Sequence, residues 1–173
     1  LSNDVGGEFS RSSVLDFESV PLNFEPGSFR DRTSRVFLAD GRVYRTLNSE
    51  ALAAWRRVSG ESFFQEMMTS GRIVHSAEVS IDGFARLELP SDVAGILEHE
   101  RIPFVSYPYE WSFHQLQQAA LLTLDIQKES MLSGMSLKDA TPFNVTFDPY
   151  NKPLFIDTLS FETYRPEDPW VAY

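Results

Sequence analysis

Apolar and polar positions alternate in two short runs near the beginning of the chain, over residues 35–38 and 42–47. A period of two is typical of a β-strand with one buried face. Asp40-Gly41 lies between the runs, and this pair favours the two-residue turn of a β-hairpin. The sequence therefore predicts two antiparallel strands here.

Two helices are predicted directly after this hairpin. Asn48 or Ser49 can cap the first helix, which continues to about residue 58 because its apolar positions fall on one face. A Ser-x-x-Gln capping box over residues 62–65 predicts a second helix over residues 63–69.

Further short runs have the composition of strands. Three of them cover residues 73–80, 84–89 and 103–107. Near the end of the chain, residues 145–147 and 154–156 bracket a turn-forming segment, so a second hairpin is predicted there.

The clearest helix begins at Ser112, which has capping-box spacing to Gln115, and it closes at Gly134. Apolar residues recur along one side of this helix, with the spacing of a face that packs on a core: Phe113, Leu116, Ala120, Leu124 and Met131.

The order of these elements is an α+β pattern with two lobes that meet near residues 107–111. We expect an extended leader over residues 1–27 and a β-rich upper lobe over residues 28–108. Residues 109–173 are then a lower-lobe fragment that carries a loop with candidate chemistry.

Composition narrows the classes of function. With 173 residues, 42% hydrophobic and 23% charged, the chain can fold as a soluble globular protein. A net charge of −10 argues against broad binding to nucleic acids or anionic membranes, because both require clustered Lys and Arg. The absence of cysteine excludes disulfides and thiolate metal sites, and it is compatible with the cytoplasmic location that we expect.

Three oxygen-bearing side chains follow the long helix. Asp139 and Asn144 lie in the loop after it, and Asp157 follows the second predicted hairpin. Carboxylate and amide oxygens are hard ligands that suit Mg²⁺, which commonly shares phosphate oxygens. A carboxylate in such a loop can also accept the proton of an attacking hydroxyl group. Turn formation alone is the alternative, because Asp and Asn are common in turns.

The spacing Asp-x-x-x-x-Asn, a hairpin, and an Asp after two apolar residues resembles the catalytic and metal-binding motifs of protein kinases. The resemblance implies a kinase-like two-lobe fold with a truncated helical lower lobe, and ATP and Mg²⁺ as cofactors. By position, Asp139 matches the catalytic Asp, and Asn144 and Asp157 match the metal ligands. Lys138 stands where kinases commonly have Arg, and Arg45 stands on the strand that carries the phosphate-binding Lys.

The sequence departs from the kinase pattern at several positions. No His precedes Asp139 at the usual place, and Thr158-Leu159 follows Asp157 where Phe-Gly is common. Residues 27–30 are a poor substitute for a glycine-rich loop. Arg cannot reproduce the geometry of a compact ammonium group, and its acidic partner is left open among three candidates: Glu50, Glu61 and Glu66.

A second resemblance involves three longer strings, over residues 97–104, 107–113 and 137–145. They are similar to the N-terminal region of bacterial SAM-dependent methyltransferase proteins, including nodulation-type ones. The chain begins at Leu1 and ends on an apolar aromatic run, so we expect a longer parent protein. The resemblance implies that SAM is bound only by a covalently linked downstream domain.

Two hypotheses remain at this point. The first is an ATP- and Mg²⁺-dependent phosphotransferase that acts on an unknown small molecule or hydroxyl group. The second is a degenerate, pseudokinase-like module that binds a nucleotide and serves the downstream methyltransferase. We expect surface or core roles rather than metal binding for the three histidines: His75, His99 and His114.

Overall fold

The computed structural model describes residues 22–25 and 33–167. Its largest sheet contains four antiparallel strands in the order β1-β2-β4-β3. Their bounds are Ser34–Ala39 for β1, Arg42–Leu47 for β2, Ser76–Val79 for β3 and Gly95–His99 for β4.

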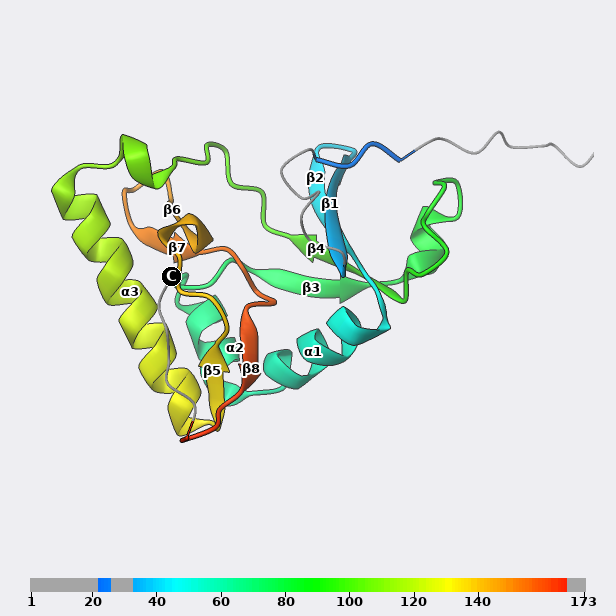
Figure 1. Cartoon of the computed structure of the whole chain (residues 1–173). Helices are drawn as coiled ribbons and strands as arrows, with labels where there is room; N and C mark the ends of the chain where they lie inside the picture. Colours follow the sequence, from blue (N-terminus) through cyan, green and yellow to red (C-terminus); the bar gives the residue numbers. More distant parts are fainter. Residues whose placement is uncertain (1–21, 26–32, 168–173) are drawn as a thin grey trace, which may run out of the picture.

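Two smaller antiparallel sheets complete the β-structure. One pairs β5 (Met135–Leu137) with β8 (Phe161–Thr163), and the other pairs β6 (Val145–Phe147) with β7 (Pro153–Phe155). The helices are α1 (Ser49–Ser59), α2 (Ser62–Thr69) and α3 (Phe113–Leu132), with short 3-10 segments η2 (Ile81–Phe84), η3 (Pro108–Glu110) and η4 (Pro142–Asn144). In Figure 1, α3 lies at one end of the molecule and the β1–β2 hairpin lies toward the other, with the two small sheets beside α3.

Both predicted hairpins are confirmed. Asp40 and Gly41 have φ values of 49° and 75°, as the two-residue turn between right-twisted strands requires. Glycine adopts such a φ without steric cost, which explains its place in this turn. The β6–β7 pair begins and ends within one residue of the predicted runs.

Helix α1 begins as expected, but α2 does not. Asn48 accepts a 2.9 Å hydrogen bond from the amide of Ala51 and so caps α1. In α2 the N-cap is Glu61, and no side chain caps the helix there. The predicted capping box is wrong because Gln65 donates instead to the carbonyl of Ser59, at 2.6 Å.

Two of the predicted strands are wrong. Residues 84–89 begin in η2 and continue without a strand, and residues 103–107 contain no strand either. Phe84, Leu87 and Leu89 of the first run instead pack against a cluster of buried residues in the large sheet: Phe37, Tyr44 and Ile96. The run over residues 73–80 contains β3, although the strand is shorter than predicted.

Strand β4, which the sequence did not predict, is paired on both edges and lies inside the large sheet. Ile96 and Leu97 are fully buried within it. Gly95 begins the strand, where a Cβ atom would lie 2.7 Å from Cδ1 of Leu52. A side chain at this position would displace the side chain of Leu52, so glycine lets α1 approach the strand closely.

Helix α3 has the predicted start and the opposite buried face. Ser112 and Gln115 form the expected capping box. The predicted apolar face is exposed, however: Phe113 is 82% exposed, and Leu116, Leu124 and Met131 are exposed as well. The buried face includes Ala119, Leu122, Ile126 and three polar residues, Thr123, Gln127 and Ser130. The buried side of α3 therefore contains polar residues and the exposed side contains large apolar residues, which is the reverse of the predicted orientation.

Buried polar groups on α3 have partners, which explains their position. The side chain of Gln127 accepts from the amide of Leu137 at 2.9 Å and donates to Ser136 at 3.0 Å, so it connects α3 to β5. Thr123 and Ser130 donate to carbonyls of the helix itself. Buried polar groups are tolerated when such bonds are made.

The larger hydrophobic cluster contains residues from both sides of the predicted boundary at residue 108. It joins α1 and α2 to α3, β5, β6, β7 and β8. Phe64 and Phe161 lie at its centre, with ring centroids 5.6 Å apart. In the described part of the chain, no helix is both long and apolar enough to cross a membrane.

The corrected orientation of α3 makes a stability prediction. Ile126 is fully buried, whereas Leu124 is 53% exposed on the other side of the helix. We expect Ile126→Ala to lower the free energy of unfolding by roughly 2–5 kcal/mol, because it removes buried methyl groups and leaves a cavity. Leu124→Ala, the matched control, should change it by less than about 0.5 kcal/mol. Urea unfolding of both variants measures the difference, and a reversed order of the two effects would contradict this orientation.

Candidate functional site

A cavity of about 270 Å³ lies where α1 faces the segments around Asp139 and Asp157. Both of these carboxylates line it, together with Lys138. Residues of α1 form another wall, and Glu50 is the acidic one among them. The fold therefore brings together three of the five predicted site residues at one cavity.

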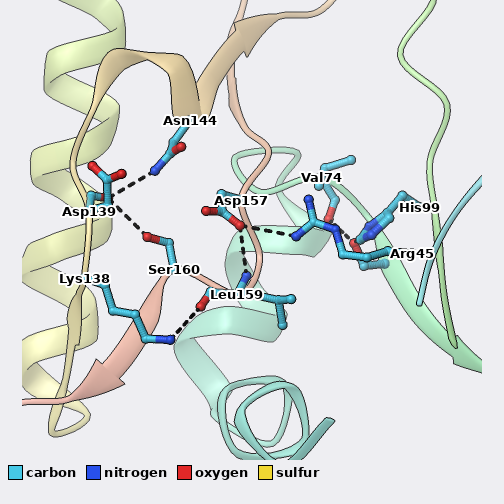
Figure 2. Close-up of polar contacts among 10 residues, drawn as sticks. Arg45, Val74, His99, Lys138, Asp139, Asn144, Asp157, Leu159 and Ser160 are labelled. Carbon is cyan, nitrogen blue, oxygen red and sulfur yellow. Dashed lines mark hydrogen bonds and ion pairs between the residues drawn. The ribbon is translucent and has the colours of Figure 1, made fainter. Parts of the chain in front are cut away.

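Arg45 reaches this region from the large sheet. Its Nη1 atom lies 3.4 Å from Oδ1 of Asp157, across 112 positions of sequence. The side chain of Arg45 is only 17% exposed, and that of Asp157 is 35% exposed. Partial burial reduces screening by water, although 3.4 Å is long for a charge-assisted bond. Figure 2 shows Arg45 directed at Asp157 from the side opposite Asn144.

The loop that carries Asp139 is held by its own hydrogen bonds. Oδ1 of Asp139 accepts from the amide of Thr141 at 2.8 Å, and its carbonyl accepts from Asn144 Nδ2 and Ser160 Oγ, each at 3.2 Å. These bonds orient the carboxylate and leave its Oδ2 atom without a hydrogen bond in the described part of the chain. Figure 2 shows Asn144 and Ser160 converging on Asp139 from two sides.

The donor set partly fits a magnesium ion. Asn144 and Asp157 come from neighbouring segments, since the amide of Ile156 donates to the carbonyl of Asn144 at 2.8 Å. The side-chain nitrogen of Asn144 donates to the carbonyl of Asp139, so the side-chain oxygen of Asn144 is left for another partner. Oδ1 of Asp157 accepts two long contacts of 3.4 Å, from Arg45 and from the amide of Leu159. Two oxygens fit an ion that retains waters and shares phosphate oxygens.

No group of three His, Cys, Asp or Glu side chains among the described residues could hold a metal ion without other ligands.

Lys138 lines the cavity, and its side chain contacts Leu159, another residue of the lining. Its Nζ atom donates to the carbonyl of Leu159 at 3.2 Å, two residues after Asp157. The side chain is exposed, so it can exchange this carbonyl for an anionic ligand.

The acidic partner of Arg45 is not one of the three glutamates left open by the sequence. Among the described residues, Arg45 pairs with Asp157, and none of Glu50, Glu61 and Glu66 forms an ion pair with it. The candidate glycine-rich segment over residues 27–30 and most of the predicted leader lie outside the described residues.

Next to Arg45 lies His99, one of the three histidines for which a surface or core role was expected, and it is buried. His99 is 9% exposed, and its Nδ1 atom lies 2.6 Å from Oγ of Ser76. Burial, with a smaller contribution from the positive charge of Arg45, lowers the pKa of His99 to about 3. His99 is thus a neutral core histidine near pH 7. No motif could have revealed it, because 23 positions separate it from Ser76.

Comparison with known proteins adds one relative. The chain is 36% identical over 149 residues to the nodulation protein NoeA of Rhizobium meliloti strain 1021. The matched region covers 85% of this chain but only 30% of NoeA, so the chain spans less than a third of that protein's length. No protein-family model matches the chain.

The depressed pKa of His99 predicts how stability depends on pH. The unfolded chain binds a proton on this residue below about pH 6.5, and the folded chain does so only near pH 3. Between these values the unfolded state carries more protons, so His99 lowers the free energy of unfolding as pH falls. The contribution of His99 to the free energy of unfolding then changes by up to about 1.4 kcal/mol per pH unit.

Urea unfolding between pH 7 and pH 4.5 tests this expectation. His99→Gln should remove this part of the slope, because glutamine does not titrate. The wild type, measured in parallel over the same pH range, is the reference. An unchanged slope in His99→Gln would show that His99 is not held neutral by the fold.

Proposed function

We propose that the chain is a kinase-like domain that binds ATP with Mg²⁺ and transfers the terminal phosphoryl group to a hydroxyl group. The observation that carries the proposal is the cavity that Asp139 and Asp157 line together, with Arg45 beside Asp157. A cation from the sheet and an acid from the loop after a hairpin face each other at one cleft. Phosphoryl transfer requires such opposite charges around the phosphates.

The arrangement of elements supports a kinase-like fold. The antiparallel sheet that carries Arg45 lies next to a helix with an acid, Glu50, at the cavity. The long helix α3 precedes the loop of Asp139, and the β6–β7 hairpin separates Asn144 from Asp157. These are the positions that the kinase resemblance assigns to the phosphate-binding, catalytic and metal-binding residues.

Each residue then has a distinct role. Asp157 and Asn144 would hold the Mg²⁺ ion, which neutralises charge on the nucleotide phosphates. Arg45 and Lys138 would contact those phosphates from two sides of the cavity. Asp139 would accept the proton of the attacking hydroxyl group at Oδ2, because Oδ1 is already held by the amide of Thr141.

A binding module without turnover is the second candidate. The direct contact between Arg45 and Asp157 favours it, because the arginine uses the carboxylate that a metal ion requires. Arginine also lacks the compact geometry of lysine at a phosphate. As a binding module, the domain would hold a nucleotide without turnover. Binding of the nucleotide would then affect the rest of a longer protein.

We further propose that this longer protein contains a SAM-dependent methyltransferase domain after the present chain. The similarity to NoeA supports a longer protein, since 70% of NoeA lies outside the matched region. SAM would then be a cofactor of that domain rather than of this one.

Nucleotide binding is tested by thermal unfolding with ATP and Mg²⁺ together and separately. A ligand at 100 times its Kd stabilises the native state by about 2.7 kcal/mol, which raises Tm by roughly 5–10 °C for a chain of this size. We expect that shift only when both are present. Asp157→Ala should abolish it, because the phosphates would lose their metal, and Asp139→Ala should retain it.

Slow ATP hydrolysis, measured on the same variants, separates the two candidates. The phosphotransferase loses turnover in Asp139→Ala while still binding ATP, and the binding module has no turnover to lose. Asp125→Ala, on the exposed side of α3, is the matched surface control. Equal Tm shifts in the wild type, Asp139→Ala and Asp157→Ala would rule out a kinase-like site.

Arg45 provides an independent test from the other side of the cleft. Arg45→Ala should weaken binding of ATP with Mg²⁺ by at least about tenfold, since a charge-assisted contact to phosphate contributes roughly 1.5–3 kcal/mol. Arg42 lies on the same strand, is 63% exposed and pairs with Glu98, so Arg42→Ala is a matched control that should bind normally. Isothermal titration calorimetry compares the two, and equal affinities would remove Arg45 from the site.

A further inference from the structure

The sheet places Arg45 and His99 on one face as diagonal neighbours. Arg45 pairs with Leu97 and Val43 pairs with His99 in the β2–β4 register. Directly paired residues in antiparallel strands share a face, and diagonal neighbours are within reach of long side chains. Figure 2 shows the imidazole ring of His99 beside the Arg45 side chain.

The hydrogen bonds of Ser76 favour one tautomer of His99. Oγ of Ser76 lies 3.1 Å from the carbonyl oxygen of Val74, to which its hydroxyl can donate, and 2.6 Å from Nδ1 of His99. A hydroxyl that donates to the carbonyl accepts from Nδ1–H, and this arrangement satisfies all three groups. In that tautomer the neutral ring carries a lone pair and no hydrogen on Nε2.

Two complementary atoms are left unsatisfied at this place. Nε2 of His99 is buried and has no hydrogen-bond partner in the described structure, and the same holds for Nε of Arg45. One is an acceptor and the other is a donor. Buried polar groups without partners are rare in proteins, and a hydrogen bond between these two atoms would satisfy both.

We propose that His99 is a positioning residue for Arg45, and that its Nε2 atom accepts a hydrogen bond from the Arg45 Nε–H. The bond fixes the guanidinium group at one edge and leaves its terminal nitrogens directed toward Asp157 and the cavity. The low pKa of His99 agrees with this role, since a protonated ring could not accept the bond and would repel the guanidinium. For its consequence on ligand binding, the proposal rests on the proposed nucleotide site.

Two conservative variants separate the nitrogens of His99. A glutamine side chain places a polar atom near the position of Nε2, whereas asparagine places one near Nδ1. His99→Gln should therefore keep the acceptor for Arg45 and lose the bond to Ser76. His99→Asn should keep the bond to Ser76 and lose the acceptor.

NMR of the free 173-residue chain tests the proposal without any nucleotide. The imidazole spectrum of ¹⁵N-labelled protein should show the Nδ1–H tautomer, and the Nε–H proton of Arg45 should be protected from exchange with solvent. That protection should persist in His99→Gln and fall at least tenfold in His99→Asn. A proton on Nε2, or equal protection in both variants, would overturn the proposal.

Binding of ATP with Mg²⁺ provides the functional measurement. We expect His99→Gln to bind within about threefold of the wild type and His99→Asn to bind at least fivefold more weakly. Normal binding in both variants, with binding lost in Arg45→Ala, would overturn the positioning role and leave the nucleotide site intact. Failure of the wild type to bind would instead refute the proposed function, and the NMR result would still decide whether His99 holds Arg45.

Discussion

Phe155 and Phe161 are buried on either side of Asp157 along the chain, and the geometry of the candidate site depends on their packing. Phe161 contacts Phe63 and Phe64 of α2, with ring centroids 5.9 and 5.6 Å apart. The backbone of Phe155 exchanges hydrogen bonds with Arg72 and Val74, both at 2.9 Å. Asp157 is therefore held by the same core that supports the large sheet. Because the two aromatic anchors are six positions apart, the carboxylate has little freedom to leave the cleft.

This constraint also explains why the loop of Asp139 has a defined position. The amide of Lys138 donates to the carbonyl of Ser160, and the carbonyl of Asp139 accepts from the Ser160 hydroxyl. Ser160 is itself 3% exposed and adjoins Phe161. The aromatic core therefore fixes Asp157 directly and Asp139 through Ser160, while α3 supports the loop from behind through Gln127 and β5. Packing, rather than a rigid loop sequence, brings the two acids to one cavity.

Local signals in the sequence were sufficient where a few adjacent residues determine the structure. Asp40-Gly41 determines its own turn, and Ser112 caps α3 through a partner three positions later. The failures involve partners that are distant in sequence. Strand β4 lies between β2 and β3, so its burial depends on strands that its own five residues cannot reveal. The buried face of α3 is set by Gln127 meeting β5, a polar contact that outweighs the apolar pattern along the helix.

The residues of the candidate site also separate into those that a local motif indicates and those whose partners are distant in sequence. A motif relates the spacing of Asp139, Asn144 and Asp157, and the fold brings the two acids to one cavity while Asn144 contacts the carbonyl of Asp139. The partner of Arg45 was not predictable, because Asp157 lies 112 positions away in the sequence. The identity of residue 45 also acquires a physical reason from its surroundings. A lysine could meet Asp157 through its single ammonium group, but it has no donor along its stem for the neutral His99 beside it. In the proposed arrangement, arginine gives Nε–H to the histidine and a terminal nitrogen to the acid, so a buried neutral histidine on β4 and an arginine on β2 suit each other. The departure from the kinase pattern at residue 45 is therefore matched by the residue that the sheet places next to it.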